Sequence, residues 1–390
     1  MISTRPTIPA TRFVERLAAA RTLANTAGLS AILVGVGADM RYLAGYAAMP
    51  LERLTMLVIP AVGEPSLVVP RLEVAPARLA PPAAAGLLPI LTWEEGDDAH
   101  ELVASLARPV RGQLAGPDQR VAVSDDLPAR HLLPLQEHLA GARFSVASAV
   151  LRELRMVKDP DEIALLTLAA HAADRVVGQI AAGRLVGRTE VDVAREVRER
   201  LLAEGHDEAL FAIVGSGPNS ASPHHEASDR VIRAGEPIVL DLGGVLGGYG
   251  SDTTRTLWVT GGDPARGPDE RFRHLFGVLL GAQAAATRAV RPGLACEAVD
   301  AAARRPIEAE GYGDAFFHRT GHGIGLEGHE EPYIIGGNPE PLREGMAFSV
   351  EPGIYLPGEY GARIEDIVVC GPDGPIALNE SFRELYVVDG

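Results

Sequence analysis

The sequence is poor in cysteine and in positive charge, and each deficit excludes a class of function. Cys296 and Cys370 are the only cysteines among 390 residues, so there is neither a disulfide framework nor a CxxC metal motif. Asp and Glu outnumber Lys and Arg by 52 to 36, and the resulting net charge of −16 would repel nucleic-acid phosphates. We therefore expect a protein of the reducing cytoplasm that binds no nucleic acid.

Long apolar runs are missing as well. No segment approaches eighteen consecutive apolar residues, and the N-terminal stretch MISTRPTIPATRFVERLAAA becomes amphipathic without first passing through an apolar signal core. These absences predict a soluble, unprocessed protein that does not bind a membrane. A chain of this length exceeds what one hydrophobic core usually serves, so we expect two domains.

The first part of the chain alternates between helical and strand patterns. Apolar residues recur at helical spacing from Phe13 until Gly28, which is suited to a helix C-cap, and LSAILVGV follows as a short buried strand. TMLVIP and SLVVP are further strand candidates, whereas PARLAPPAAAGLLP is predicted to be a loop because helix breakers occur throughout. This order indicates an α/β domain.

A strong helix start marks the expected domain boundary. Asp159 is suited to the N-cap and Pro160 to the first helical position of a long alanine-rich helix. We place the boundary just before this start, which divides the chain into domains of residues 1–152 and 153–390.

The second part contains an internal repeat. In GEPIVLDLGG and in GMAFSVEPGI, a glycine precedes an acid, Asp241 or Glu351, by six residues, and another glycine follows it by two. Each acid is expected to end an apolar strand, after which a glycine-rich turn leads to a second strand with its own acid, Asp252 or Glu365. If the two hairpins pack about a pseudo-twofold axis, the four carboxylates converge.

Four converging carboxylates repel one another, and burying them unpaired would shift their pKa values or unfold the site. Carboxylate oxygens together with one imidazole suit Mn²⁺, Co²⁺, Fe²⁺ or Zn²⁺, and bridging carboxylates are typical of two-metal hydrolytic sites. The segment TGHGIGLEGHEEP offers two histidines, His322 and His329, either of which can complete such a set. The alternative, in which each acid caps a turn or meets an arginine, is disfavoured by the repeat.

Six segments carry a resemblance to a known family. PHHEASDR, VLDLGG, GSDTTRT, HRTGHGIGLEGHEEP, SVEPGIY and ARIED, in this order and spacing, resemble the M24 metallopeptidases of the pita-bread fold and, among them, the Xaa-Pro peptidases prolidase and aminopeptidase P. The resemblance covers roughly residues 155–390. The N-terminal part, with RYLAGY, is similar to the creatinase/prolidase N-terminal domain. The implied fold is an α/β N-terminal domain followed by a pita-bread domain with a pseudo-twofold repeat.

The resemblance also implies roles for individual residues. Two divalent metal ions are implied, with manganese first and cobalt, zinc or iron as alternatives, and Asp252 and Glu365 bridge them. Glu351 would carry the proton of the attacking water to the leaving nitrogen, and His329 would contact the substrate carbonyl. His225 matches no ligand of the family. The implied metal ligands are Asp241, Asp252, His322, Glu351 and Glu365, and the implied catalytic and substrate-binding histidines are His224, His318 and His329.

The activity that the resemblance implies is metal-dependent hydrolysis of the bond preceding proline, in an Xaa-Pro dipeptide or short peptide, by a homodimer. Some prolidases carry an arginine after the segment matching GHEEP, where this chain has Tyr333 and no arginine before Pro341. Aminopeptidase P, acting on longer peptides, is therefore the alternative. Arg41 is the candidate for binding a dipeptide carboxylate across a dimer, and the alternative is that it is an ordinary surface arginine. A further alternative is that the protein is another metal-dependent amide hydrolase of the same fold. Creatinase, which needs no metal, and binding modules that have lost the metal ligands both agree poorly with the presence of all five implied ligands.

Overall fold

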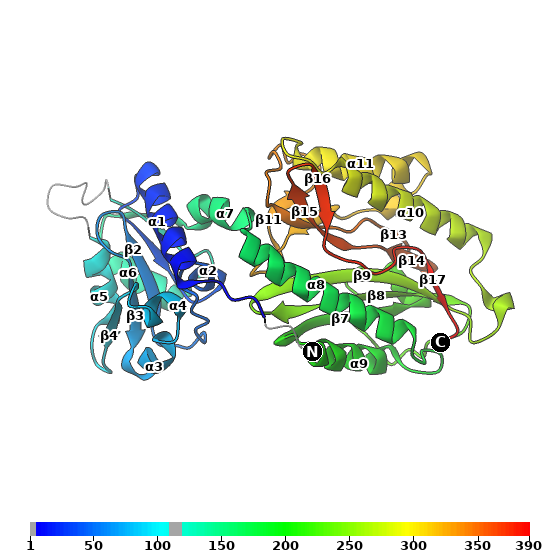
Figure 1. Ribbon diagram of the computed structural model, residues 1–390, viewed down its shortest axis with the longest axis horizontal. Coiled ribbons are helices and arrows are strands. Elements are labelled where there is room, and N and C mark those ends of the chain that lie inside the picture. Colours follow the sequence, from blue (N-terminus) through cyan, green and yellow to red (C-terminus); the bar gives the residue numbers. More distant parts are fainter. Residues whose placement is uncertain (1–4, 109–118) are drawn as a thin grey trace. The chain divides into compact units, whose positions relative to one another are not determined.

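The structure is a computed structural model that describes residues 5–108 and 119–390 (Figure 1). The chain divides into two compact units. The N-terminal unit comprises Thr7–Arg155, and the C-terminal unit comprises Met156–Gly390, to which Arg5 and Pro6 also belong. Both units combine helices and strands, which confirms the predicted α/β class.

A six-stranded mixed sheet forms the centre of the N-terminal unit, with the strand order β4-β3-β2-β1-β5-β6. Its strands are β1 (Ala31–Val34), β2 (Met56–Pro60), β3 (Ser66–Pro70), β4 (Ile90–Trp93), β5 (Arg120–Val123) and β6 (Arg143–Val146). Its helices are α1 (Ala10–Thr26), α2 (Ala38–Ala44), α3 (Val74–Ala77), α4 (Pro81–Ala84), α5 (Ala99–Ala107), α6 (Ala129–His138) and α7 (Ser148–Met156).

Most of the local predictions for this unit are confirmed. Helix α1 ends just before Gly28, whose φ of 66° suits glycine, and the three predicted strands are β1, β2 and β3. The prediction of a loop at PARLAPPAAAGLLP is wrong in part, because it contains the end of α3 and all of α4. Pro81 occupies the first helical position of α4, where a missing N–H costs nothing, so these prolines start a helix instead of breaking one.

The C-terminal unit consists of two similar halves, each with a sheet and a pair of long helices. The first half contains α8 (Pro160–Ala181), α9 (Glu190–Ala203), β7 (Glu208–Ser216), β8 (Glu236–Leu246) and β9 (Tyr249–Val259). The second contains α10 (Glu270–Ala289), α11 (Cys296–Ala309), β10 (Gly321–Gly323), β11 (Glu330–Ile334), β12 (Ala347–Val350), β13 (Gly353–Leu356), β14 (Tyr360–Arg363), β15 (Asp366–Gly371) and β16 (Gly374–Ala377). A final strand, β17 (Tyr386–Val388), returns to pair with β9.

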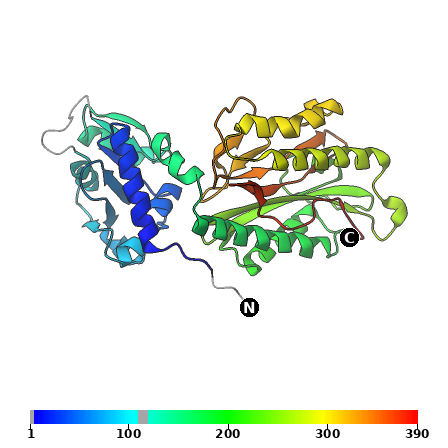
Figure 2. The ribbon, with the colours of Figure 1, turned by 45° about the horizontal axis from the view of Figure 1, so that its top comes forward.

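The two helix pairs cover opposite sides of the strands. Figures 1 and 2 show α8 and α9 on one side of this unit and α10 and α11 on the other, with the strands between them. Each pair packs on its own apolar cluster, one built on β7, β8 and β9 and the other on β12, β14 and β15. Two similar halves are what the internal repeat predicted, and their arrangement is the pita-bread fold that the family resemblance implied.

Helix α8 begins at the predicted position. The Asp159 side chain accepts hydrogen bonds from the backbone N–H groups of Asp161 and Glu162, and the Asp159 N–H donates to the Glu162 carboxylate, which completes a capping box. In the described part of the chain, α8 is the one helix whose length and composition would let it cross a membrane. Half of its most apolar window is buried against the unit's own sheet, as in the core helix of a globular domain.

The two hairpins that carry the acids differ in one respect from the prediction. Strand β8 does not end at Asp241 but runs on through its glycines to Leu246, and the turn follows at Gly247 and Gly248. In the second hairpin the strands break at Glu351 and again at Glu365, between β12 and β13 and between β14 and β15. The registers on either side of the breaks place Glu351 opposite Glu365, so both acids sit at one kink of the hairpin.

Candidate active site

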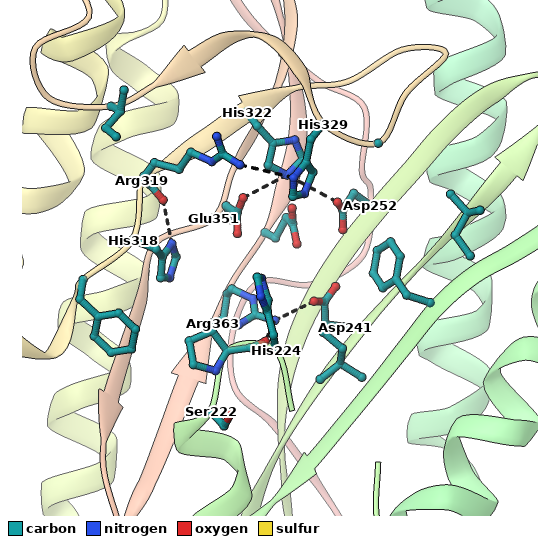
Figure 3. A pocket seen from close by; sticks show the side chains of 18 residues that line it. Ser222, His224, Asp241, Asp252, His318, Arg319, His322, His329, Glu351 and Arg363 are labelled. Atoms are coloured by element: carbon teal, nitrogen blue, oxygen red, sulfur yellow. Dashed lines mark hydrogen bonds and ion pairs between the residues drawn. The ribbon is translucent and has the colours of Figure 1, made fainter. Parts of the chain in front are cut away.

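A pocket of about 850 Å³ opens over the strands of the C-terminal unit (Figure 3). All residues that the sequence assigned to metal, proton transfer or substrate line it, with the exception of Arg41. The polar lining residues are Ser222, His224, Asp241, Asp252, His318, Arg319, His322, His329, Glu351, Arg363 and Glu365, and the apolar side is formed by Leu210, Phe211, Ile213, Phe317 and Ile335.

Strand register brings the two acids of the first hairpin onto one face. Asp241 on β8 lies directly opposite Thr254 on β9, and Asp252 lies opposite Gly243, two residues further along the same face. A side chain at Gly243 would overlap with the carbonyl oxygen of Ser251, so glycine is required for the strands to pass so closely. Asp241 and Asp252 therefore share a face, as the first half of the repeat predicted.

The second hairpin is held against the first by hydrogen bonds. Thr254 donates its hydroxyl to Glu365 at 2.7 Å, and the Glu365 N–H donates to the Thr254 carbonyl at 3.1 Å. The side chains of Asp241, Asp252 and Glu365 are all buried. Oxygen atoms of these three residues lie within 4.8 Å of one another, which is a group of ligand atoms with room for a cation between them.

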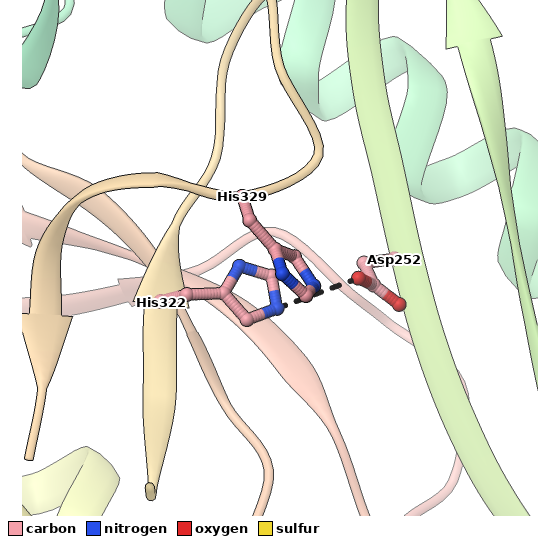
Figure 4. Close-up of side chains that lie close together, drawn as sticks. All are labelled: Asp252, His322 and His329. Carbon is pink, nitrogen blue, oxygen red and sulfur yellow. Dashed lines mark ion pairs between the residues drawn. The ribbon is translucent and has the colours of Figure 1, made fainter. Parts of the chain in front are cut away.

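His322 lies beside the acids on β10 (Figures 3 and 4). Its Nε2 is 3.2 Å from Glu351 Oε1 and 3.7 Å from Asp252 Oδ2, and the ring is almost fully buried. The backbone brings it this deep because Gly321 packs directly on the carbonyl oxygen of Ser349, where any Cβ would collide. The glycines that flank this histidine are therefore needed for close strand contact.

The electrostatics of the cluster call for a positive charge. Burial, followed by the negative charge of Asp241, raises the pKa of the Asp252 carboxyl well above its usual range. Burial and the charges of Asp252 and Glu351 do the same to the pKa of Glu365. Burial and the neighbouring negative charges therefore disfavour the ionised form of both groups, and a cation between them would have the opposite effect.

Glu351 is in a different position. Burial alone would raise its pKa, but the hydrogen bond and charge of His322, helped by His318 and Arg363, lower that pKa to about 2. Its side chain is 15% exposed, more than that of Asp241, Asp252 or Glu365. Glu351 is therefore the carboxylate of the cluster most accessible from the pocket.

One oxygen of Asp241 supports the presence of a metal. Asp241 Oδ2 accepts a hydrogen bond from Arg363 Nη2 at 2.7 Å, whereas the buried Oδ1 has no hydrogen-bond partner among the described residues. Buried acceptors are rarely left unpaired, and a divalent ion satisfies such an oxygen. This residue set therefore fits a metal centre.

Arg363 connects the acids to His318. It donates to the Tyr355 hydroxyl at 2.8 Å, which is 3.0 Å from His318 Nε2, and His318 Nδ1 lies 2.7 Å from the carbonyl oxygen of Arg319. Because that carbonyl can only accept, His318 carries its proton on Nδ1, and its Nε2 accepts from Tyr355. Burial lowers the pKa of His318, so it presents a neutral, fixed ring to the pocket.

His329 stands over His322, with ring centroids 3.8 Å apart, and Asp252 is nearby (Figure 4). Desolvation, followed by the charges of His322 and Arg319, lowers its pKa to about 4. Its Nδ1 lies 3.3 Å from Arg319 Nη2, which can only donate, so the proton of the neutral ring is on Nε2. The sequence had not pointed to Arg319, although it is the immediate neighbour of His318.

Hydrogen bonds to Glu190 hold the loop that carries His224 in place. His224 is exposed at the pocket, whereas the adjacent His225 turns away and contacts Glu190 at 2.8 Å, consistent with the expectation that it is no ligand. Glu190, the first residue of α9, also accepts hydrogen bonds from Ser216 and Ser228. Sequence reasoning missed Glu190 because an acid in the first turn of a helix is ordinary.

Arg41 lies on α2 of the N-terminal unit and is not among the residues that line the pocket of the C-terminal unit. Its predicted role in binding a substrate carboxylate stays a prediction.

Comparison with known proteins agrees with this geometry. Residues 164–372 match the metallopeptidase family M24, and residues 16–157 match the creatinase/prolidase N-terminal domain. The chain is 46% identical to a probable dipeptidase PepE of Mycobacterium tuberculosis, over 96% of each sequence, and 33% identical to an Xaa-Pro dipeptidase of Pyrococcus furiosus, over 83% of this chain and 86% of that one.

Among solved structures, the dipeptidase PepE of Mycobacterium ulcerans superposes with a TM-score of 0.89 at 45% identity, covering 98% of this chain and 99% of that one. M24 metallopeptidases use a dinuclear divalent metal centre, and the cluster of acids and His322 described above has the ligands for one. From its sequence, its fold and the composition of this pocket, the chain belongs to metallopeptidase family M24.

Proposed function

We propose that this enzyme hydrolyses the peptide bond preceding proline in Xaa-Pro dipeptides, using two divalent metal ions. The observation that carries the proposal is that the pocket contains three overlapping sets of ligand atoms, each set lying within 4.8 Å. The names of its relatives, dipeptidase and Xaa-Pro dipeptidase, support the choice of substrate. The proposed metal ligands are Asp241, Asp252, His322, Glu351 and Glu365.

Asp252 and Glu365 are the proposed bridging ligands. Asp252, Glu365 and His322 each belong to two of the three sets, and of these three only the two carboxylates have a pair of oxygen atoms that would be shared between two ions. When bound, the metal ions supply Lewis acidity, which activates water and polarises the substrate carbonyl. Carboxylate oxygens with one imidazole favour Mn²⁺, with Co²⁺, Zn²⁺ or Fe²⁺ as alternatives.

The remaining steps depend on side chains that the pocket already orients. Glu351, the most accessible carboxylate, takes the proton of the attacking water and passes it to the leaving imino nitrogen. His329 offers its Nε2–H to the oxygen on which negative charge develops. His224 and His318 bind the proline ring, His318 with the side of a ring whose nitrogens are both hydrogen-bonded within the protein.

A metal-depletion experiment tests the proposal. Chelation should abolish hydrolysis of Ala-Pro, and added Mn²⁺ or Co²⁺ should restore it, while Ala-Ala is cleaved poorly throughout. Asp252→Asn should lose metal and activity, whereas Asp373→Asn, which replaces an exposed acid, should keep both. Full activity of a demonstrably metal-free preparation would contradict the proposal.

The alternative activity is that of aminopeptidase P, and a further alternative is another metal-dependent amide hydrolase. Comparing kcat/KM for Ala-Pro with that for Ala-Pro-Pro decides between the first two, since a clear preference for the longer peptide favours aminopeptidase P. We also propose a cytoplasmic homodimer, in which Arg41 of a second copy contacts the substrate. Arg41→Ala should then raise KM for Ala-Pro and hardly alter KM for the tripeptide.

A further inference from the structure

The pocket contains an arginine, Arg319, to which the proposed reaction assigns no role. Two arginines line the pocket, Arg319 and Arg363. Arg363 is 3% exposed, and four of its five N–H donors are directed at Thr254, Tyr355, Asp241 and the Pro223 carbonyl, so it is largely committed to contacts within the protein. Arg319 is the arginine of the pocket that can reach a substrate.

Arg319 makes no ion pair with a carboxylate within residues 5–108 and 119–390. Its contacts are the hydrogen bond to His329 Nδ1 at 3.3 Å and the face of the Tyr333 ring, whose centroid is 4.4 Å from its Cζ. A guanidinium carries five N–H donors, and stacking on a ring engages its face and leaves its edges open. Most of its donors are therefore available to an acceptor that enters the pocket.

The backbone holds this arginine in place. The next residue, Thr320, is completely buried and donates its hydroxyl to Asp300 at 2.8 Å, and its N–H donates to the Ile334 carbonyl at 3.0 Å. On the other side, the Arg319 carbonyl accepts from His318 at 2.7 Å. The guanidinium thus starts from a fixed backbone and points toward His329 (Figure 3).

We propose that Arg319, in addition to the Arg41 contact from a second copy proposed above, binds the C-terminal carboxylate of the dipeptide and so selects dipeptides over longer peptides. The proposal rests on the proposed Xaa-Pro hydrolysis. A dipeptide carboxylate lies one residue, about 3.5 Å, beyond the scissile carbonyl, and every added residue moves it out by about the same distance. Arg319 is next to His329, whose ligand atom lies within 4.8 Å of those of Asp252 and His322, so its reach matches the shorter substrate.

Recognition of a carboxylate by a guanidinium is bidentate and depends on charge. The test is therefore a pair of substrates that differ in this group alone, Ala-Pro and Ala-prolinamide. The natural enzyme should prefer Ala-Pro. Arg319→Gln should lower kcat/KM for Ala-Pro by about 10- to 100-fold and that for the amide by less than about threefold, the range expected when a hydrogen bond to a charged group is lost.

Two further variants complete the design. Arg319→Lys should give an intermediate loss, because an ammonium keeps the charge but not the paired donors. Arg291→Gln, which replaces an exposed arginine outside the pocket, should match the natural enzyme. Melting temperature and metal content of Arg319→Gln verify that the fold and the metal centre are intact.

Three outcomes overturn the proposal, and a fourth overturns the activity on which it rests. Equal losses for Ala-Pro and Ala-prolinamide would mean that Arg319 acts by orienting His329. A loss confined to substrates with Asp or Glu before proline would mean that it binds that side chain. If the natural enzyme with its metal cleaves neither substrate, the proposed Xaa-Pro activity itself fails, which is distinct from an active enzyme whose preference Arg319→Gln leaves unchanged.

Discussion

Glu190 allows a prediction whose size follows from the structure. Its carboxylate is completely buried at the start of α9, and donors from four residues converge on it: Ser216, Asn219, His225 and Ser228. Burial alone would raise its pKa, but hydrogen bonds, with those from Ser228 and His225 the strongest, lower it to about 2. These four residues belong to the segment that also carries His224.

The lowered pKa translates into stability. A shift from 4.5 to about 2 corresponds to about 3 kcal/mol in favour of the folded protein when Glu190 is ionised. Because the folded-state pKa lies below the unfolded one, this contribution is complete above pH 4.5. It is lost as the pH falls toward 2, and less than half remains near pH 3.

Glu190→Gln should remove most of this stabilisation at pH 7, because the amide offers one acceptor oxygen and turns an N–H₂ group toward donors. For a unit of this size, a loss of about 3 kcal/mol lowers the melting temperature by about 6–12 °C. Glu199→Gln, on an exposed position of the same helix, is the matched control.

Calorimetry or circular dichroism at pH 7 measures both variants, and a pH series down to 3 measures the acid dependence. Because the carboxylate anchors the His224 loop, Glu190→Gln should also lower kcat/KM at temperatures where the protein is folded. A melting temperature within about 1 °C of the natural protein, or an equal loss in Glu199→Gln, would refute the reasoning.

Three more predictions follow from the same kind of argument. His322→Ala should lower metal content together with turnover, whereas His329→Ala should keep the metal and lower kcat by about two orders of magnitude, as for a lost oxyanion donor; metal analysis that gave the reverse pattern would exchange the two roles. Lys158, the only lysine in the sequence, forms an ion pair with Glu330 at 2.6 Å, and both side chains are buried. Lys158→Met should lower the free energy of unfolding, measured in urea, by about 3–5 kcal/mol because it leaves the Glu330 charge buried and unpaired. Replacing Glu330 by Leu as well should restore most of this free energy. Burial lowers the pKa of His206 to about 4, so below pH 6.5 the unfolded chain binds a proton at this residue that the folded protein does not. The free energy of unfolding should therefore fall by about 2 kcal/mol between pH 7.5 and pH 5, and His206→Asn should lack this pH dependence.

Local chemistry explains which parts of the fold were predictable. The capping box of α8 and the glycine after α1 act within a few residues of chain, so their signals are complete in the sequence. The loop prediction at PARLAPPAAAGLLP failed in part because Pro81 has opposite meanings at the first position and in the interior of a helix. Position relative to a helix start, and not residue type, decided that case.

The sequence by itself determined the type and order of the groups in the pocket, because the repeat of glycine, acid and glycine places the acids at corresponding positions of two similar hairpins, and the four acids converge once those hairpins pack about a pseudo-twofold axis. Tertiary structure alone decided how readily each group ionises, since Glu351 and Asp252 are both carboxylates and differ only in their neighbours and exposure. It also decided that Arg363 donates to Asp241, whereas Arg319 lies beside His329 with most of its N–H donors available. Hydrogen bonds and charges act through space, over a few ångströms between residues more than a hundred positions apart in the chain, and the order of residues in a sequence does not specify such distances.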